Sequence, residues 1–306
     1  MTWLPTKHQT QNSKSPCCQP KHRSNPENMA LPPGRLIDIP DRGQTFIREV
    51  QGPANAPTLI LLHGWTATAD LNWFTCFEEL GKHFNVVALD QRGHGQGIRS
   101  RRSFRLSDCA DDVAALADAL GVNTFIPVGY SMGGTIAQLV WQRHSDRVDG
   151  LVLCSTAPVF AKSREERVGF IGITGLATLA RLAPKQTVDW FTEQIYLQRK
   201  TEGMDSWAIE QMAGHDWRQI LEAGKEIGSF NSLQWLPGVN VPTSVVITTQ
   251  DQVVPPERQQ RLLDLLQDVD VHLVDGGHNA IYAEQRTYVP KLIAACLSVQ
   301  ERALQS

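Results

Sequence analysis

The chain has 306 residues, of which 42% are hydrophobic and 20% are charged, and its formal net charge is −3. This is the balance of an ordinary globular protein, and a near-neutral charge gives no electrostatic argument for a nucleic-acid partner. No apolar run approaches the roughly 20 residues of a membrane span. The length suits one core domain with an insertion better than two independent domains.

The N-terminal 28 residues are rich in Lys, His, Gln, Ser, Asn and Pro and contain almost nothing to bury. We expect residues 1–30 to form a disordered extension. The segment lacks the apolar stretch of a signal peptide, so we expect a cytoplasmic protein. Met29 stands just before the first strand-like run, and we hypothesise that it is the functional start; mass analysis of the N-terminus of the native protein would test this.

Strand-like and helical patterns alternate along most of the chain, which predicts a mostly parallel sheet of the eight-stranded type with helices on both faces. The first two runs, Arg35–Ile39 and Thr45–Glu49, flank a Pro-Asp-Arg-Gly turn that predicts an antiparallel hairpin at the sheet edge. Leu106–Leu120 has helical spacing, and Gly121 follows as a stop. The other strand-like runs are Thr58–Leu62, Val86–Leu89, Thr124–Val128, Leu151–Cys154, Thr243–Thr249 and Val271–Asp275.

Four arginines, Arg99, Arg101, Arg102 and Arg105, form a local basic run. We interpret it as a solvated loop leading into the next helix, and as a second reading one arginine steers an anionic substrate. The cysteines show no C-x-x-C pair and no ligand spacing with histidine, so we expect neither a disulfide framework nor a zinc site. These are Cys17, Cys18, Cys76, Cys109, Cys154 and Cys296.

The sequence GYSMGG, Gly129–Gly134, follows one of these runs and opens a helical pattern. A serine between glycines at a strand-to-helix junction is typical of a nucleophile elbow, whose tight turn strains the backbone of the nucleophile and leaves no room for neighbouring side chains. The unsatisfied N–H groups of the following helix favour a negative oxygen there. The motif alone is of moderate specificity, because a glycine-rich turn without chemistry also fits it.

An oxyanion needs two converging N–H donors. The backbone of Met132, directly after Ser131, is the first candidate, and that of Trp65 in the run Leu61–Trp65 is the second. His63 in the same run is interpreted as a residue that shapes the loop and not as the base.

A base and an orienting acid follow the serine in the order Ser, Asp, His. Asp251 comes directly after a β-branched strand, and His278 follows the last strand and two glycines. His272 lies inside a strand pattern, and neither His94 nor His144 has the right place in this order. Asp90 precedes the serine and is interpreted as a carboxylate that holds its own turn.

The strand pattern is interrupted between residues 158 and 236, where helical segments such as Val168–Leu182 and Thr187–Gln198 occur. We predict a helical cap over residues 158–236, inserted after the sixth strand, and a core made of residues 31–157 and 237–306. Part of the cap's apolar and aromatic side chains would face the site and favour a hydrophobic substrate. Gly169, Gly172 and Gly175 within a helical pattern suggest an irregular, gating segment.

Together these motifs resemble the α/β-hydrolase fold, and more narrowly its bacterial esterase, lipase, lactonase and cofactor-free perhydrolase branch, from about Arg35 to the C-terminus. The resemblance implies that Ser131 is the nucleophile, His278 the general base and Asp251 the orienting acid. It further implies backbone oxyanion donors at Trp65 and Met132, no cofactor and no metal.

We therefore expect a serine hydrolase that cleaves a small hydrophobic carboxylic ester or lactone through an acyl-enzyme. Alternatives on the same triad are a cofactor-free perhydrolase, a C–C hydrolase, an acyltransferase and a hydroxynitrile lyase, and a ligand-binding receptor with this fold is the alternative from another class. A dehalogenase is disfavoured because it needs a carboxylate where Ser131 stands. The sequence leaves a homo-oligomeric state open and does not identify the substrate.

Overall fold

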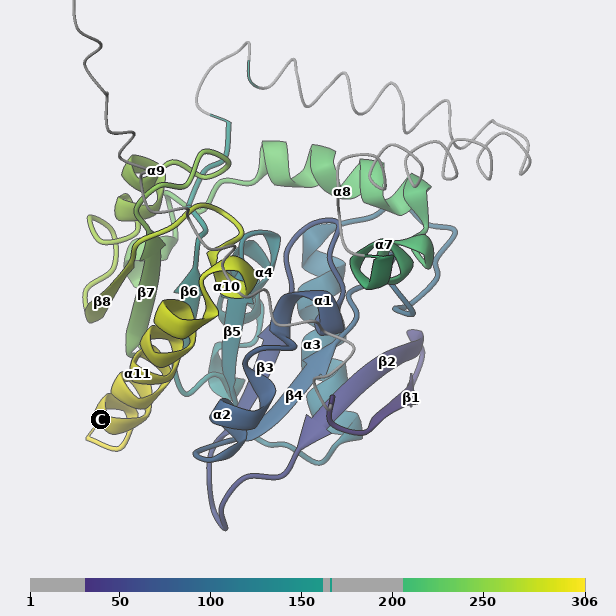
Figure 1. Ribbon diagram of the computed structural model, residues 1–306, viewed down its shortest axis with the longest axis horizontal. Coiled ribbons are helices and arrows are strands. Elements are labelled where there is room, and N and C mark those ends of the chain that lie inside the picture. The colour runs from purple at the N-terminus through teal and green to yellow at the C-terminus, as the bar shows by residue number, and fades with distance from the viewer. Residues whose placement is uncertain (1–30, 162–165, 167–205, 306) are drawn as a thin grey trace, which may run out of the picture.

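A computed structural model describes residues 31–161, 166 and 206–305 of the chain. Eight strands form one sheet in the order β1-β2-β4-β3-β5-β6-β7-β8 (Figure 1). The strands are β1 (Gly34–Ile39), β2 (Gly43–Val50), β3 (Thr58–Leu62), β4 (Asn85–Leu89), β5 (Ile126–Tyr130), β6 (Leu151–Cys154), β7 (Thr243–Thr248) and β8 (Val269–Val274). The expected eight-stranded sheet is thus confirmed.

The predicted edge hairpin is also present. β1 pairs with β2 and β2 with β4 in antiparallel fashion, whereas every pairing from β4 to β8 is parallel. The hairpin turn needs left-handed backbone at Asp41, with φ 61°, and at Gly43, with φ 118°. The parallel strands consequently end at one edge of the sheet, which is where a site is expected in an open α/β sheet.

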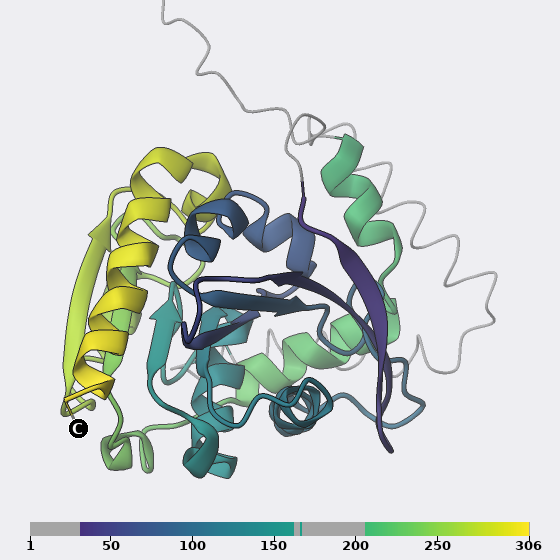
Figure 2. The same cartoon turned by 90° about the horizontal axis from the view of Figure 1, so that it is seen from below.

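Helices cover both faces of the sheet (Figure 2). Alternate side chains of β3 show this division, since Leu59 and Leu61 pack with one buried cluster while Ile60 and Leu62 pack with the other. The helices α1 (Ala69–Trp73), α2 (Phe77–Gly81), α10 (Ala280–Ala283) and α11 (Gln285–Ala303) contribute to the first cluster. The helices α3 (Leu106–Ala119) and α4 (Met132–Arg143) contribute to the second. A short helix, α9 (Pro256–Gln260), follows β7, and two 3-10 turns span Ser145–Arg147 and Leu236–Gly238.

Between β6 and β7 the described residues form two helices, α7 (Ser206–Ala213) and α8 (Trp217–Ser229), and no strand. Asp216 caps α8 by accepting the N–H groups of Arg218 and Gln219. Ala223 and Ile227 of α8 are buried in the same cluster as α3 and α4. The predicted helices Val168–Leu182 and Thr187–Gln198, and the three glycines of the expected gating segment, lie outside the described residues. An insertion with helices after the sixth strand is therefore present, and its domain boundaries stay a prediction.

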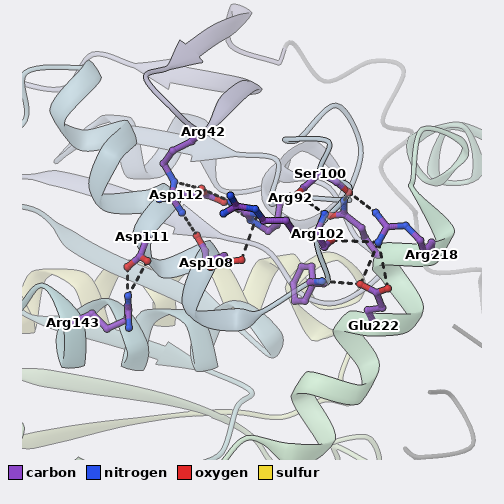
Figure 3. Close-up of polar contacts among 12 residues, drawn as sticks. Arg42, Arg92, Ser100, Arg102, Asp108, Asp111, Asp112, Arg143, Arg218 and Glu222 are labelled. Atoms are coloured by element: carbon purple, nitrogen blue, oxygen red, sulfur yellow. Dashed lines mark hydrogen bonds and ion pairs between the residues drawn. The ribbon is translucent and has the colours of Figure 1, made fainter. Parts of the chain in front are cut away.

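Polar contacts attach α8 to the loop that follows β4 (Figure 3). Glu222 accepts the N–H of Phe104 at 2.7 Å, and Arg218 donates to the carbonyl groups of Ser100 and Arg102. Within the same loop Arg92 forms a bidentate pair with Asp112 of α3, at 2.6 and 2.7 Å. The loop is therefore held from the core and from the α7–α8 segment.

The basic run lies in this loop. Arg99 is tied to the backbone, since it donates to the carbonyl groups of Gly95 and Gly214. Arg101, Arg102 and Arg105 are exposed, as a solvated loop predicts. The suggestion that one of them steers an anion stays a prediction.

Candidate active site

Ser131 stands at the sharp turn between β5 and α4. Its backbone has φ 53° and ψ −114°, a conformation that costs a non-glycine residue roughly 1–3 kcal/mol. The turn is fixed by the neighbouring strand, because the N–H of Ser131 donates to the carbonyl of Cys154 at 2.9 Å and the hydroxyl of Thr156 donates to the carbonyl of Ser131 at 2.8 Å. The strained elbow that the sequence predicts is present, and it presents the serine hydroxyl at the carboxyl edge of the sheet.

The three side chains selected from the sequence lie together. His278 Nε2 is 3.0 Å from Ser131 Oγ, and His278 Nδ1 is 2.7 Å from Asp251 Oδ2. The carboxylate accepts a hydrogen bond from the N–H at Nδ1, which leaves the Nε2 lone pair to face the serine hydroxyl. A hydroxyl, an imidazole and a carboxylate in this relay can transfer an acyl group through a covalent intermediate.

Asp251 is buried, with 3% of its surface exposed, yet well supplied with donors. Its Oδ1 accepts the N–H groups of Val253 and Val254 at 2.9 and 2.8 Å, and its Oδ2 also accepts from the hydroxyl of Thr248 at 2.8 Å. Burial by itself raises the pKa of Asp251, but the hydrogen bond and charge of His278 and these donors outweigh it, so the pKa lies below its ordinary value. The carboxylate is thus ionised and able to orient the imidazole at neutral pH.

The loop after β3 lies beside the serine. A Cβ placed on Gly64 would be 3.5 Å from the Cβ of Ser131. Among the described residues, no acceptor takes the backbone N–H of Trp65 or of Met132, the first residue of α4. Two N–H groups are therefore available on the two segments that flank the serine hydroxyl.

His63 and Asp90 have the supporting places that the sequence suggests. His63 is fully buried, its Nδ1 donates to the carbonyl of Gly64 at 2.8 Å, and its Nε2 accepts the N–H of Gln91 at 2.9 Å. Burial lowers the pKa of His63 to about 3, so the ring is neutral and links two loops. The carboxylate of Asp90 accepts the N–H groups of Ala69 and Gln96 and joins the same two regions.

The other histidines that the sequence offers as candidates for the base do not contact the serine. His272 lies in β8 opposite Val246, and His144 ends α4, where it contacts Asp111. His94 is buried in the loop after β4.

Some supporting residues are not evident from the sequence. Tyr130 donates its hydroxyl to the carbonyl of His278, and Gln259 donates to Asp251 Oδ2 at 3.2 Å. Tyr130 occupies the variable position before the serine, and Gln259 lies in α9, so neither carries a motif. Only the packing of β5 and α9 against the last loop brings them to the site.

The chain matches the model of the α/β-hydrolase fold over residues 57–285. It belongs to that family. The family assignment confirms the fold expected from the sequence and the assignment of the protein as a hydrolase enzyme.

Known proteins of this α/β-hydrolase family resemble the chain at low identity. It is 25% identical over 266 residues to the AB hydrolase superfamily protein YisY of Bacillus subtilis, covering 85% of this chain and 98% of the relative. It is 29% identical over 229 residues to a bifunctional esterase/perhydrolase of Acinetobacter calcoaceticus, covering 67% and 78%. The crystal structure of an enol-lactonase from Burkholderia xenovorans LB400 superposes on this chain with a TM-score of 0.69 at 21% identity. The match covers 86% of this chain and 100% of the enol-lactonase chain.

In the part of the chain that the structure describes, no helix of this α/β hydrolase combines the length and the apolar character that a membrane-spanning helix needs.

Proposed function

We propose that this α/β hydrolase is a serine hydrolase that cleaves a carboxylic ester or lactone of a small hydrophobic substrate. The observation that carries the proposal is the continuous relay from Ser131 Oγ through His278 to Asp251, with contacts of 3.0 and 2.7 Å on a strained elbow. The names of an esterase and of an enol-lactonase among similar proteins support the same class of bond.

In the proposed mechanism Ser131 Oγ attacks the carbonyl carbon while His278 Nε2 takes the hydroxyl proton. The carbonyl oxygen becomes an oxyanion, which accepts from the N–H groups of Trp65 and Met132. The intermediate collapses to an acyl-enzyme, and the alcohol leaves with the proton from His278. A water molecule, deprotonated by His278, then attacks the acyl carbon, and the acid leaves as Ser131 regains its proton.

Hydrolysis of p-nitrophenyl esters of increasing acyl length tests this proposal. We expect wild-type turnover with a clear preference for one range of acyl lengths, which sizes the acyl site, and a loss of roughly 10⁶ in turnover for Ser131→Ala. Ser145→Ala is the control, because Ser145 is an exposed serine in the 3-10 turn that follows α4. Equal turnover in wild type and Ser131→Ala would overturn the mechanism.

A second candidate is cofactor-free perhydrolysis, in which hydrogen peroxide replaces water as the nucleophile that attacks the acyl-enzyme. The similarity to a bifunctional esterase/perhydrolase, at 29% identity, favours testing it. Formation of peracid from acetate and hydrogen peroxide, dependent on Ser131, would support this activity. Ester turnover without peracid formation would reject perhydrolysis and support hydrolysis alone.

A further inference from the structure

Three histidine rings lie in contact beneath the loop that contains Trp65. The rings of His63 and His94 have centroids 5.1 Å apart, and those of His94 and His215 are 5.4 Å apart. All three side chains are buried. His63 and His94 belong to the core loops after β3 and β4, whereas His215 belongs to the connection between α7 and α8. The α7–α8 segment thus reaches into the packing behind the proposed oxyanion hole.

The protonation of His215 follows from its partners. The N–H of Gly95 donates to His215 Nδ1 at 2.9 Å, so Nδ1 carries a lone pair and the ring proton is on Nε2. Nε2 lies 3.2 Å from the carbonyl oxygen of Thr66 and donates to it. Burial lowers the pKa of His215 to about 4, which agrees with a neutral ring. A neutral His215 therefore joins the loop after β4 to the loop after β3.

Thr66 needs such support. Its φ is 60°, an unfavourable value for a β-branched residue. Two further contacts flank it: the indole Nε1 of Trp65 donates to the carbonyl of Ile220 at 2.8 Å, and the hydroxyl of Thr68 donates to Gln211 at 3.0 Å. The α7–α8 segment thus binds the Trp65–Thr68 loop at three places in order, with His215 at the centre.

We propose that His215 is a positioning residue for the oxyanion hole, which holds the carbonyl of Thr66 and thereby fixes the backbone N–H of Trp65 beside Ser131. This inference rests on the proposed function. His215 touches neither the serine nor the substrate carbonyl and acts through the loop. The link also makes the α7–α8 segment part of the proposed catalytic geometry.

The expected loss of turnover follows from the oxyanion donor that the Trp65–Thr68 loop supplies. Loss of one oxyanion donor costs roughly 10²–10³ in turnover, and a misplacement of about 1 Å costs roughly 10². A loosened Trp65 donor is displaced but not removed. We therefore expect a decrease of about ten- to a hundredfold in kcat with KM within about twofold.

Three variants separate positioning from a merely structural role. His215→Gln carries an amide N–H2 that can reach Thr66 but loses the acceptor for Gly95. His215→Asn can keep an acceptor for Gly95 but is too short to reach Thr66. His215→Phe loses both contacts and keeps a ring beside His94 and Trp217, with which His215 is in contact. Each variant is compared with wild type by near-ultraviolet circular dichroism and by the midpoint of urea unfolding.

We expect His215→Gln to stay within about threefold of wild-type kcat, and His215→Asn and His215→Phe to show the ten- to hundredfold decrease. If folded His215→Asn turns over as wild type, or if His215→Gln falls as far as His215→Asn, the inference is wrong. The Gln and Asn pair keeps this test decisive if His215→Phe does not fold. Ser131→Ala is assayed alongside: turnover in that variant would reject the proposed function itself, whereas an inactive Ser131→Ala with fully active His215 variants would reject only the role of His215.

Discussion

Asp251 shows how single residues in this molecule depend on their surroundings. A carboxylate with 3% exposure would be costly if it were unpaired, but it accepts from His278, from Thr248 and from two backbone N–H groups. Only one of these contacts involves the imidazole. The others hold the carboxylate in place whether or not His278 is protonated, so its orienting effect persists through the proposed reaction cycle.

Replacement of Asp251 by Asn should lower turnover by roughly 10⁴ without unfolding the protein, because an amide favours the wrong imidazole tautomer. The measurement is kcat for the preferred p-nitrophenyl ester. Asp264→Asn is the control, since the Asp264 carboxylate is exposed and its ion pair with the exposed Arg261 is long, at 3.8 Å. A turnover for Asp251→Asn within tenfold of wild type would contradict the role of the carboxylate.

At this scale the sequence allows prediction of Ser131, Asp251 and His278, because each follows a strand pattern and their order is constrained. It does not reveal His215, since a histidine between two helical segments has no periodic or spacing signal. Its partners, the carbonyl of Thr66 and the N–H of Gly95, are backbone groups about 120–149 residues away. Backbone partners leave no trace in residue types.

The elbow between β5 and α4 is the element that positions the serine, and its two flanking glycines explain why it is so tight. A Cβ on Gly129 would lie 2.2 Å from the carbonyl oxygen of Gly133, and a Cβ on Gly133 would lie 1.9 Å from that of Leu62. Both neighbours are backbone, which cannot rotate away. Strand β3, strand β5 and helix α4 therefore approach each other as closely as the chain allows.

Replacement of Gly133 by Ala should consequently prevent formation of the native elbow, with loss of soluble folded protein or a large decrease in the unfolding midpoint. Gly238→Ala is the matched control, because the nearest atom to a Cβ there is Trp141 Cη2 at 3.7 Å, an ordinary contact. Circular dichroism and urea unfolding measure both variants. A Gly133→Ala protein as stable as Gly238→Ala would show that the close approach is relieved in solution.

Strand boundaries are the part of the elements that the sequence predicts least well. The run Thr124–Val128 predicts a strand that ends before the elbow, whereas β5 spans Ile126–Tyr130 and continues to the residue before Ser131. Gly129 has a low strand preference and interrupts the pattern before Tyr130, whereas pairing with the neighbouring strands extends β5 through both residues. The helix Leu106–Leu120, in contrast, ends within one residue of its prediction because Gly121 follows it.

For the whole molecule, packing of the α7–α8 segment against the loops after β3 and β4 buries three histidines and keeps them neutral. Burial lowers the pKa of His63 to about 3, that of His215 to about 4 and that of His94 well below its ordinary value of 6.5. The unfolded chain binds protons at these rings below about pH 6.5, whereas the folded chain does not. The free energy of unfolding must therefore fall as the pH is lowered from about 6.5 toward 4, and it changes little from this source above pH 7.

We expect the rings of His63 and His215 each to contribute a loss of about 2 kcal/mol at pH 5 relative to pH 7, and His94 to add to it in the same direction. Urea unfolding at pH 7, 6 and 5 measures this loss, and His215→Gln should reduce it by roughly the share of one ring. His83→Gln is the control, because His83 is exposed and away from the cluster. A stability independent of pH over this range, or an equal effect of both substitutions, would contradict neutral burial of the histidines.

The proposed function depends on an acyl-enzyme at Ser131, which mass spectrometry of the intact protein and its peptides can detect. The protein is mixed with its preferred p-nitrophenyl ester, quenched with acid within the first turnovers, and digested. We expect one acyl group per chain on the peptide that contains Ser131, and none in Ser131→Ala. Acylation of a different residue, or steady hydrolysis with no acyl group on any peptide, would contradict it.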